Sequence, residues 1–281
     1  MVDWMITCAD LLTPLYDRLH ELILSQPVIA ADETTLKVVS ENKAKCYMWV
    51  YISGADSSEG ALPNTDIPNT VLYDYQSNCA GQCAGDYLQG YSSYLQVDGY
   101  AGYQKTQDTL AGRWAHARRK FVEAKIVQGK QSSGRADWAM NHIQKLYRIE
   151  TQIKASTTEE QQPIKQEKST ILLKQSEAWL VKSEPQVLAK SKLSEAITYS
   201  LNQWDKLNKY TQNGQLSIDD YRAERAIKPF VIGRKNWLFS QTAKGAKASA
   251  ILYSIIETSK ANGLTPFDYM RHLLEHITYT G

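Results

Sequence analysis

Three short runs of β-branched and aromatic residues follow one another early in the sequence, and they constrain the fold more than any other feature. They are PVIAADETTLKVV (27–39), KCYMWVYIS (45–53) and NTVLYDY (69–75), and polar breakers separate them. Runs of this length and composition are typical of strands, and the Gly, Pro and Asn residues between the second and third indicate a loop. We therefore expect three successive strands of one sheet.

Helical patterns flank these runs. Leucines recur at helical spacing over 10–25 and lead into Pro27, and a short helix is expected over 79–88. SSYLQVD (92–98) then predicts a fourth strand that ends at Asp98. The order of elements is β-β-β-α-β, which indicates a mixed α/β fold.

The rest of the chain is predicted to be largely helical. GYAGY forms a tight turn, RWAHARRK (113–120) opens a helix that runs through FVEAKIV, and 132–209 is mostly helical. DDYRAERAIKPF predicts a helix with Asp at its N-cap and Pro229 at its end, followed by an extended KNWLF segment. An alanine-rich helix with Gly263 as its C-cap and a last helix over 266–277 complete the chain.

Composition excludes several classes of protein. Of the 281 residues, 43% are hydrophobic and 22% are charged, which is typical of a globular protein, and no run is long and apolar enough to span a membrane. Four scattered cysteines do not make a disulfide framework, and the CxxxC formed by Cys79 and Cys83 lacks the second pair that a zinc site needs. We expect a cytoplasmic, nucleoid-associated protein without a membrane partner.

The basic residues are clustered although the net charge is only +2. RWAHARRK (113–120) is one cluster. Residues 222–247 form a second cluster with one acid, Glu224, and seven basic residues: Arg222, Arg225, Lys228, Arg234, Lys235, Lys244 and Lys247. Either cluster alone fits a solvated surface, but two clusters near candidate acidic residues favour an anionic partner.

Asp32 and Asp98 occupy unusual places for carboxylates. Asp32 lies in an otherwise apolar strand, and Asp98 ends a strand that contains Leu95 and Val97. Burying a carboxylate costs several kcal/mol unless it is paired or bound to a metal, although each residue could simply end its strand at the surface. With a third acid on a helix, such carboxylates suit hard divalent cations and two-metal phosphoryl transfer.

Five segments carry a resemblance to a known family. VIAADET (28–34), YLQVDGYAGY (94–103), WAHARRKF (114–121), RAERAIKPFVIGRKNWLF (222–239) and ILYSIIETSKANGLTPFDYMRHLLEHI (251–277) resemble the successive signature blocks of the insertion sequence 66 family of bacterial transposases. The likeness runs over nearly the whole chain and is weakest between about 125 and 210. The chain departs from the family pattern at 219–221, where Asp-Asp-Tyr replaces the usual Asp-Asn-Asn.

The resemblance implies a ribonuclease-H-like mixed sheet flanked by helices, with a helical insertion between the second Asp and the catalytic Glu. It places the catalytic, metal-binding triad on Asp32, Asp98 and Glu224, with two Mg²⁺ ions for which Mn²⁺ is an expected substitute. The implied activity is DNA strand cleavage followed by transfer of the 3′-hydroxyl to target DNA during transposition of an insertion sequence.

Two other acids compete with this triad. Glu33 follows Asp32 directly, so its side chain is predicted on the opposite face of the strand and is a poor co-ligand. Glu257 lies on a helix in another family block and is the second choice for the third acid.

Basic and aromatic residues are the candidates for DNA contact. Guanidinium groups match phosphate oxygens, and such contacts position DNA without reading its sequence. His116 is a possible auxiliary residue for phosphate contact or proton transfer, although its own surroundings could equally satisfy it. Trp237 and Tyr103 could stack on a base, with core packing the preferred interpretation for Trp237. The predicted DNA-binding residues are Arg118, Arg119, Lys120, Arg225, Arg234 and Lys235.

The predicted organisation has five parts. They are a leading helix (1–26), the first part of the ribonuclease-H-like core (27–130), a helical insertion (131–212), the remainder of the core with the catalytic Glu (213–240) and a C-terminal helical element (241–281). Family members usually carry a long region before the first block, so the chain resembles an N-terminally truncated catalytic segment. The expected partners are element ends and target DNA, further copies of the chain on DNA and accessory proteins of the same element.

Two alternative functions remain open at this point. One is a catalytically inactive remnant of a transposase that binds DNA without cutting it, and the other is a different two-metal ribonuclease-H-like nuclease. A glycosidase with a carboxylate pair would leave the basic clusters without a role.

Overall fold

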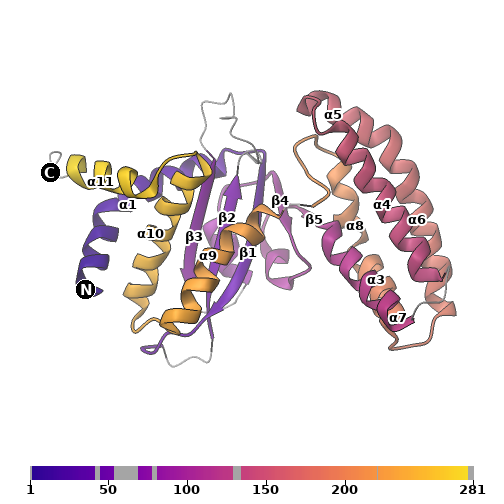
Figure 1. Cartoon of the computed structure of the whole chain (residues 1–281), viewed down its shortest axis with the longest axis horizontal. Helices are drawn as coiled ribbons and strands as arrows, with labels where there is room; N and C mark the ends of the chain where they lie inside the picture. The colour runs from indigo at the N-terminus through magenta and orange to yellow at the C-terminus, as the bar shows by residue number, and fades with distance from the viewer. Residues whose placement is uncertain are drawn as a thin grey trace. The chain divides into compact units, whose positions relative to one another are not determined.

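The computed structural model describes residues 2–41, 45–53, 69–77, 81–128, 134–219 and 221–277. The chain divides into two compact units (Figure 1). Unit 1 comprises Met1–Leu95, Ala101–Thr109 and Tyr221–Gly281, and unit 2 comprises Gln96–Tyr100 and Leu110–Asp220. Unit 1 holds most of a sheet, whereas unit 2 is mainly helical. The predicted loop before the third strand lies outside the described residues.

The described residues form a five-stranded sheet with helices beside it, so the fold is mixed α/β (Figure 1). The order is β3-β2-β1-β4-β5, and β2 is antiparallel to both β1 and β3. The β-β-β-α-β prediction is confirmed, but β5 was missed because its sequence, TLAG, is short and contains Ala and Gly. The strands are β1 (Val28–Leu36), β2 (Cys46–Ser53), β3 (Thr70–Gln76), β4 (Tyr94–Val97) and β5 (Thr109–Gly112).

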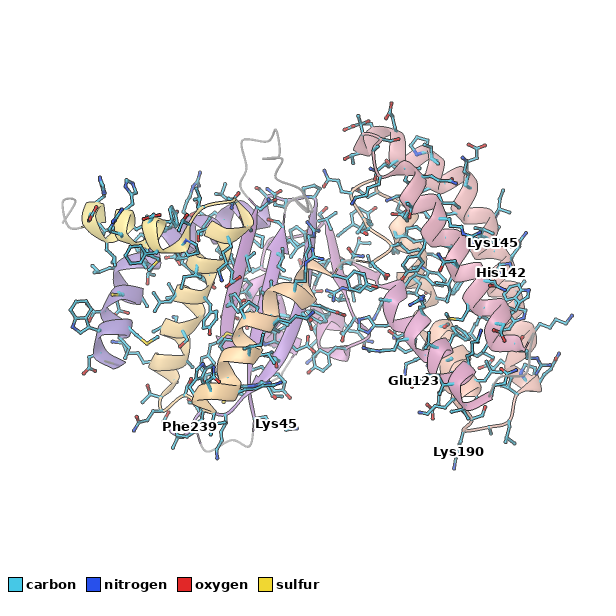
Figure 2. All side chains as sticks on the ribbon, viewed as in Figure 1. Lys45, Glu123, His142, Lys145, Lys190 and Phe239 are labelled. Atoms are coloured by element: carbon cyan, nitrogen blue, oxygen red, sulfur yellow. The ribbon has the colours of Figure 1, made fainter. Side chains whose placement is uncertain are left out.

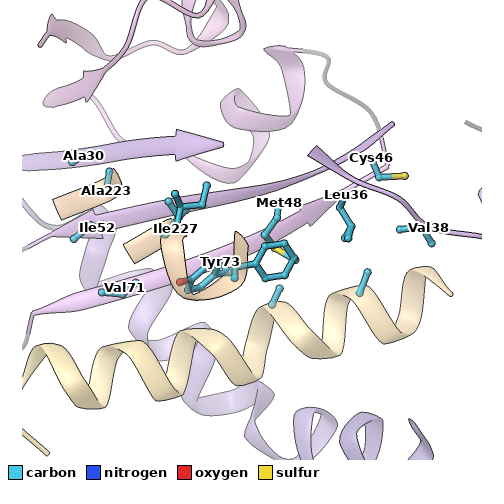
Figure 3. Close-up of a cluster of buried hydrophobic side chains, with 14 residues drawn as sticks. Ala30, Leu36, Val38, Cys46, Met48, Ile52, Val71, Tyr73, Ala223 and Ile227 are labelled. Carbon is cyan, nitrogen blue, oxygen red and sulfur yellow. The ribbon is translucent and has the colours of Figure 1, made fainter. Parts of the chain in front are cut away.

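One face of the sheet in unit 1 is covered by α9 (Arg222–Trp237) and α10 (Ala243–Ala261). Figure 3 shows the buried cluster there, which joins alternate residues of β1, β2 and β3 to alanines and large apolar residues of the two helices. Alternation along the strands places Ala30 and Leu36 on this face together with Met48 and Tyr73. Burial of these side chains holds α9 against β1 and β2.

The opposite face of the sheet carries aromatic side chains. Tyr51 stacks on Tyr87 of α2 (Gly81–Tyr87) with 4.4 Å between ring centroids, and Trp49 meets Tyr103 edge to face at 5.3 Å. α1 (Val2–Leu24) also contacts β3, since its Tyr16 hydroxyl donates a hydrogen bond to the backbone oxygen of Tyr73 at 2.9 Å. The predicted leading helix is confirmed and begins at Val2.

Asp74 of β3 lies on this aromatic face and is mostly buried. Burial raises its pKa to about 6, although a 2.7 Å hydrogen bond from Gln76 and the charge of Lys247 act in the opposite direction. The folded state therefore binds more protons than the unfolded state between pH 4 and 6. The stabilising effect of this proton is fully present below the ordinary pKa of 3.8 and is lost as pH rises through about 6.

Replacing Asp74 with Asn should therefore flatten the pH dependence of stability. Relative to Asp74→Asn, the natural chain is expected to lose about 2 kcal/mol of unfolding free energy between pH ~4 and pH ~7. Urea unfolding at several pH values measures this difference. Asp17→Asn removes an exposed carboxylate of α1 and is the matched control. Parallel pH profiles for Asp74→Asn and the natural chain would contradict the prediction.

The outer edge of β3 is capped by side chains of α10. Ser254 Oγ accepts a hydrogen bond from Tyr73 N at 2.7 Å, and Thr258 Oγ1 both accepts from Val71 N and donates to Val71 O at 3.0 Å. Asn262, just after the helix, accepts from Asn69 N and donates to Asn69 O. Hydroxyl and amide groups thus take the place of a further strand.

The C-terminal helices agree with the sequence prediction. Gly263 follows α10 with a φ of +71°, and the Leu264 N–H donates to Ser259 O at 2.9 Å, which is the C-cap geometry that favours glycine. α11 (Pro266–Ile277) has the predicted bounds. In the described part of the chain, no helix is both long and apolar enough to cross a membrane.

The prediction that Pro229 ends α9 was wrong. The helix continues to Trp237, so KNW is helical rather than extended, because Ile227 and Phe230 on either side of Pro229 are buried against the sheet. This packing outweighs the roughly 3 kcal/mol that an interior proline costs a helix. Leu238, the C-cap residue of the helix, has a φ of +64°, and the exposed Phe239 follows it (Figure 2).

Unit 2 contains most of the helices between β5 and α9. α3 packs against α4 and α7, and all three helices belong to unit 2. Aromatic side chains pack between the helices, including the half-buried Trp138 on Trp179 with 4.5 Å between centroids. The elements are α3 (Trp114–Gln128), α4 (Arg135–Ile153), α5 (Thr158–Ile164), the π-helical turn η2 (Lys165–Ser169), α6 (Thr170–Ser183), η3 (Glu184–Gln186), α7 (Lys192–Asn202), α8 (Trp204–Asn208) and η4 (Lys209–Thr211).

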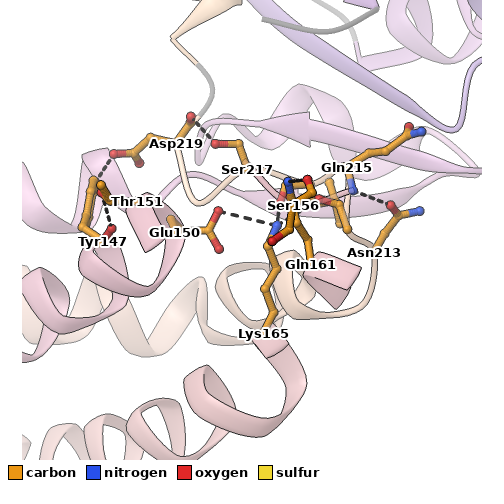
Figure 4. Close-up of polar contacts among 12 residues, drawn as sticks. Tyr147, Glu150, Thr151, Ser156, Gln161, Lys165, Asn213, Gln215, Ser217 and Asp219 are labelled. Atoms are coloured by element: carbon orange, nitrogen blue, oxygen red, sulfur yellow. Dashed lines mark hydrogen bonds and ion pairs between the residues drawn. The ribbon is translucent and has the colours of Figure 1, made fainter. Parts of the chain in front are cut away.

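A buried lysine connects these helices to the segment before α9 (Figure 4). Lys165 Nζ donates hydrogen bonds to Gly214 O at 3.0 Å and Leu216 O at 2.6 Å, and it lies 3.5 Å from a carboxylate oxygen of Glu150. The Lys165 side chain is 1% exposed. Burial lowers the pKa of Lys165 and raises that of Glu150, so their contact offsets a desolvation cost.

The sequence predicted that Asp219 caps α9, but it does not. Its carboxylate accepts hydrogen bonds from Ala115 N, in the first turn of α3, and from the Tyr147 hydroxyl of α4 (Figure 4). The residue at the N-cap of α9 is Tyr221. The Asp219 carboxylate therefore caps the N-terminus of α3, where a negative charge is also favourable.

Candidate active site

Asp32 lies in the middle of β1 and is half-buried. It shares a strand face with Ala30 and Leu36, which belong to the buried cluster with α9, so its side chain projects toward the α9 side of the sheet. Its Oδ1 accepts a hydrogen bond from Glu33 N at 2.9 Å, which restricts the orientation of the carboxylate.

Glu33 projects from the opposite face, as predicted. Its Oε2 accepts a 2.7 Å hydrogen bond from the hydroxyl of Tyr103, which is fully buried in η1 (Ala101–Lys105). Burial, followed by the charge of Glu33, raises the pKa of Tyr103 well above its ordinary value. The hypothesis that Tyr103 stacks on an exposed base is wrong, because its ring lies in the core.

Glu224 lies in the first turn of α9 and is half-buried. The preceding Ala223 belongs to the same buried cluster as Ala30 (Figure 3). Asp32 and Glu224 are therefore carried by two elements that pack together within unit 1. The partial positive charge at the N-terminus of α9 also favours a carboxylate in this turn.

Glu257 has a different environment from Glu224. It lies in α10, its side chain is 11% exposed, and Lys260 Nζ contacts its Oε1 at 2.7 Å. After burial, the charge of Glu257 is the next cause that raises the pKa of Tyr73 in β3. These contacts place Glu257 beside β3 and in an ion pair.

Asp98 directly follows β4 and belongs to unit 2. Its Oδ1 accepts a hydrogen bond from Tyr100 N at 2.8 Å, so the carboxylate closes a local turn. The neighbouring Gln96 is buried and donates to Ser217 O at 2.7 Å. Asp98 is thus held at the end of a strand, where the sequence analysis predicted it.

The structure brings together the elements of Asp32 and Glu224 and places Asp98 in the other unit. Among the described residues, no group of three or more His, Cys, Asp or Glu side chains is arranged to hold a metal ion. The three carboxylates nevertheless supply the oxygen donors that Mg²⁺ and Mn²⁺ prefer, so the donor chemistry fits these ions.

The predicted DNA-binding residues of α3 are mainly at the surface. Arg118 and Arg119 are exposed, whereas Lys120 is half-buried with its Nζ 5.0 Å from the centroid of the Tyr199 ring. A guanidinium nitrogen of Arg119 lies 3.0 Å from Nδ1 of His116. His116 therefore interacts within its own helix.

The predicted residues of α9 divide into two groups. Arg225 and Lys235 are exposed. Arg234 Nη1 donates to Thr34 Oγ1 at 3.0 Å and also to the backbone oxygen of Thr35, so this guanidinium fastens α9 to β1. Trp237 packs edge to face on Phe230 at 5.4 Å, and the core-packing interpretation of this residue is confirmed.

The cysteines add no metal site within the described residues. Cys8 and Cys46 are free thiols, and Cys46 and Cys83 are buried. Cys79, the other member of the CxxxC pair, lies outside the described residues.

Sequence reasoning missed two residues near Asp98. Burial is the main cause of both pKa shifts: it raises the pKa of Tyr199 and lowers that of Lys206. The charge of Asp98 acts on both groups and raises both pKa values. Both residues lie more than 100 positions after Asp98, in a helical segment without a recognisable motif. Only the fold reveals that they lie close enough to interact with this carboxylate.

Comparison with known proteins places the chain in a family. A model of the transposase IS66 family matches residues 1–248. The uncharacterized proteins y4qI and y4jD of Sinorhizobium fredii (strain NBRC 101917 / NGR234) are 32% and 31% identical to the chain over 292 and 287 residues. These alignments cover 99% and 98% of the chain but 52% and 55% of the relatives, so the chain spans about half of their length. No solved structure matches it.

The family match includes the strand of Asp32, the turn of Asp98 and the first turn of α9 with Glu224. Because it covers most of the sequence in one continuous range, the chain belongs to the IS66 family of transposases.

Proposed function

We propose that the chain is the catalytic domain of a DNA transposase with a ribonuclease-H-like fold. In this proposal it cleaves a DNA strand at an element end and transfers the resulting 3′-hydroxyl to target DNA during transposition of an insertion sequence. The observation that carries the proposal is the family match over residues 1–248, which spans Asp32, Asp98 and Glu224. The β-β-β-α-β order and the sheet order β3-β2-β1-β4-β5 support the fold assignment.

The proposed metal ligands are the three carboxylates. Asp32, Asp98 and Glu224 would together hold two divalent ions. Two such ions activate an attacking oxygen and stabilise a leaving oxygen in phosphoryl transfer. Hydrogen bonds from Glu33 N to Asp32 and from Tyr100 N to Asp98 hold the two aspartates in fixed orientations.

Basic side chains hold the DNA backbone in this proposal. The exposed residues Arg118, Arg119, Arg225 and Lys235 are suited to phosphate contacts that position DNA without reading its sequence. Lys120, Arg234 and His116 are the less accessible members of the set. A transposase acts on DNA, so DNA is the expected partner, with further copies of the chain required because two element ends must be joined.

A strand-transfer assay tests this proposal. The substrate is a pre-cleaved DNA end of the element, and the product is its covalent attachment to a second duplex in Mg²⁺. We expect transfer in Mg²⁺ or Mn²⁺ and none after chelation with EDTA, because the ions supply the electrostatic stabilisation. Cleavage without any transfer would instead indicate another two-metal nuclease. Salt-sensitive DNA binding without cleavage would indicate an inactive remnant and contradict the proposed activity.

A further inference from the structure

The turn after Asp98 is covered by the end of α7. A Cβ placed on Gly99 would lie 3.2 Å from Cε2 and 3.3 Å from the hydroxyl of Tyr199, and 3.6 Å from Cδ of Gln203. The helical segment of unit 2 therefore contacts the backbone next to Asp98 directly.

Lys206 lies on the next short helix, α8. The close packing around its Cβ atom fixes where the side chain begins. A Cβ on Gly112, at the end of β5, would lie 3.3 Å from the Cβ of Lys206 and 3.3 Å from the backbone nitrogen of Leu207. The side chain of Lys206 is half-buried, and its Nζ has no hydrogen-bond partner within the described part of the chain. An ammonium in such a position is costly unless an anion accompanies it.

The surroundings of Asp98 contain more positive than negative charge. Burial and then the charge of Asp98 raise the pKa of Tyr199, whereas the charges of Arg119 and Arg113 lower it. Arg113 is 2% exposed and donates to Gln96 O at 3.2 Å, while Lys120 lies over the Tyr199 ring. We call Arg113, Arg119, Lys120, Tyr199 and Lys206 the Asp98 basic cluster.

The Asp98 basic cluster contains more cationic side chains than Asp98 has negative charge. Four of its members are cationic, and Glu195 on α7, on which the charge of Lys120 also acts, is paired with Lys192 at 2.8 Å. A local excess of this kind attracts an anion. Arg119 is exposed and Tyr199 is half-buried, so the cluster reaches the surface.

We propose that Lys206, supported by Tyr199, binds a DNA phosphate at Asp98, so that the helical segment contributes a substrate-binding residue to the reaction site. This inference rests on the proposed function. A lysine ammonium is a compact charge on a flexible stem, so Nζ can turn from its buried position toward a phosphate oxygen. The same charge offsets the repulsion between the phosphate and the Asp98 carboxylate.

A binding experiment with a modified substrate tests the role of Lys206. The probe is a duplex of the element's terminal DNA with its 3′-hydroxyl exposed, prepared either unmodified or with one neutral methylphosphonate at the terminal phosphate. Ca²⁺ replaces Mg²⁺, and affinity is measured at several salt concentrations. The proteins are the natural chain, Lys206→Met, Lys206→Arg and the matched control Lys209→Met, which removes a half-buried lysine three positions away.

We expect Lys206→Met to weaken binding of the unmodified duplex about tenfold and to reduce the salt slope by about one. Lys206→Arg should retain most of the affinity, and Lys209→Met should leave it unchanged. On methylphosphonate DNA the natural chain should bind as weakly as Lys206→Met, because the contact is already lost. Thermal unfolding establishes that each variant is folded.

The outcomes separate this inference from the proposed function. If the natural chain binds and transfers DNA while Lys206→Met keeps its affinity and salt slope, the inference about Lys206 is wrong but the proposed function stands. An equal loss on both duplexes shows that Lys206 has only a structural role and also overturns it. If the natural chain neither binds nor transfers DNA, the proposed function fails and the inference fails with it.

Discussion

Asp98→Asn is expected to reduce strand cleavage and transfer by about a thousandfold or more, while DNA binding is retained. Asn has nearly the same shape as Asp, and its side-chain oxygen can still accept the hydrogen bond from Tyr100 N. It lacks the negative charge that a divalent ion requires, and the ions supply several kcal/mol of transition-state stabilisation. The measurement is Mg²⁺-dependent nicking and strand transfer on a pre-cleaved end, with DNA affinity determined in parallel.

Other acid substitutions make this test specific. Asp32→Asn and Glu224→Gln should cause losses of similar size, whereas Glu33→Gln should retain activity because Glu33 faces Tyr103 on the other side of the sheet. Glu257→Gln should also retain it. Loss with Glu257→Gln but not with Glu224→Gln would reassign the third ligand. Full activity in Asp98→Asn would show that the proposed carboxylate site is wrong.

Lys165→Met is expected to lower the free energy of unfolding by about 3–5 kcal/mol. The substitution leaves the carbonyl oxygens of Gly214 and Leu216 without their donor and the largely buried carboxylate of Glu150 without its cation. Methionine fills similar space, so the loss reports mainly on polar groups left unsatisfied. Urea unfolding followed by circular dichroism measures the change.

The matched control is Lys168→Met, which changes an exposed lysine in the same π-helical turn and should alter stability by less than about 0.5 kcal/mol. Adding Glu150→Gln to Lys165→Met should recover part of the loss, because the uncompensated charge is removed. A loss below about 1 kcal/mol in Lys165→Met would mean that water replaces the ammonium effectively.

Local sequence patterns predicted much of unit 1. Strand composition located β1 to β4, and alternation along β1 correctly separated the faces of Asp32 and Glu33. The ends of α10 and α11 were predicted because Gly263 and Pro266 act within a single turn of backbone. These features depend on neighbours within a few residues, so one sequence is enough to find them.

Features that depend on distant packing were missed. An interior proline such as Pro229 normally ends a helix. α9 nevertheless continues to Trp237, because Ile227 and Phe230 are buried against the sheet. Asp219 was assigned to the nearest helix, whereas its partners are Ala115 and Tyr147, more than 70 positions away. No local pattern contains that information.

The candidate site also combines features that local sequence predicts with features that depend on distant packing. The positions of Asp32 within β1 and of Asp98 just after β4 follow from local composition, whereas the triad with Glu224 came from the resemblance to a family. The surroundings of Asp98, including Tyr199 and Lys206, emerged only from the fold. Charge near a carboxylate is a property of three-dimensional packing, and the order of residues does not encode it locally.

The capping of β3 by α10 has a consequence for the order of events during synthesis. β3 leaves the ribosome about 180 residues before Ser254 and Thr258. The hydroxyls of these two residues accept hydrogen bonds from backbone N–H groups on the outer edge of β3. Until those residues emerge, the nascent chain carries a bare β-edge that can recruit strands from other chains. A transcript broken before the codon for Ser254 therefore yields a product prone to aggregation, even though it encodes all three proposed catalytic acids.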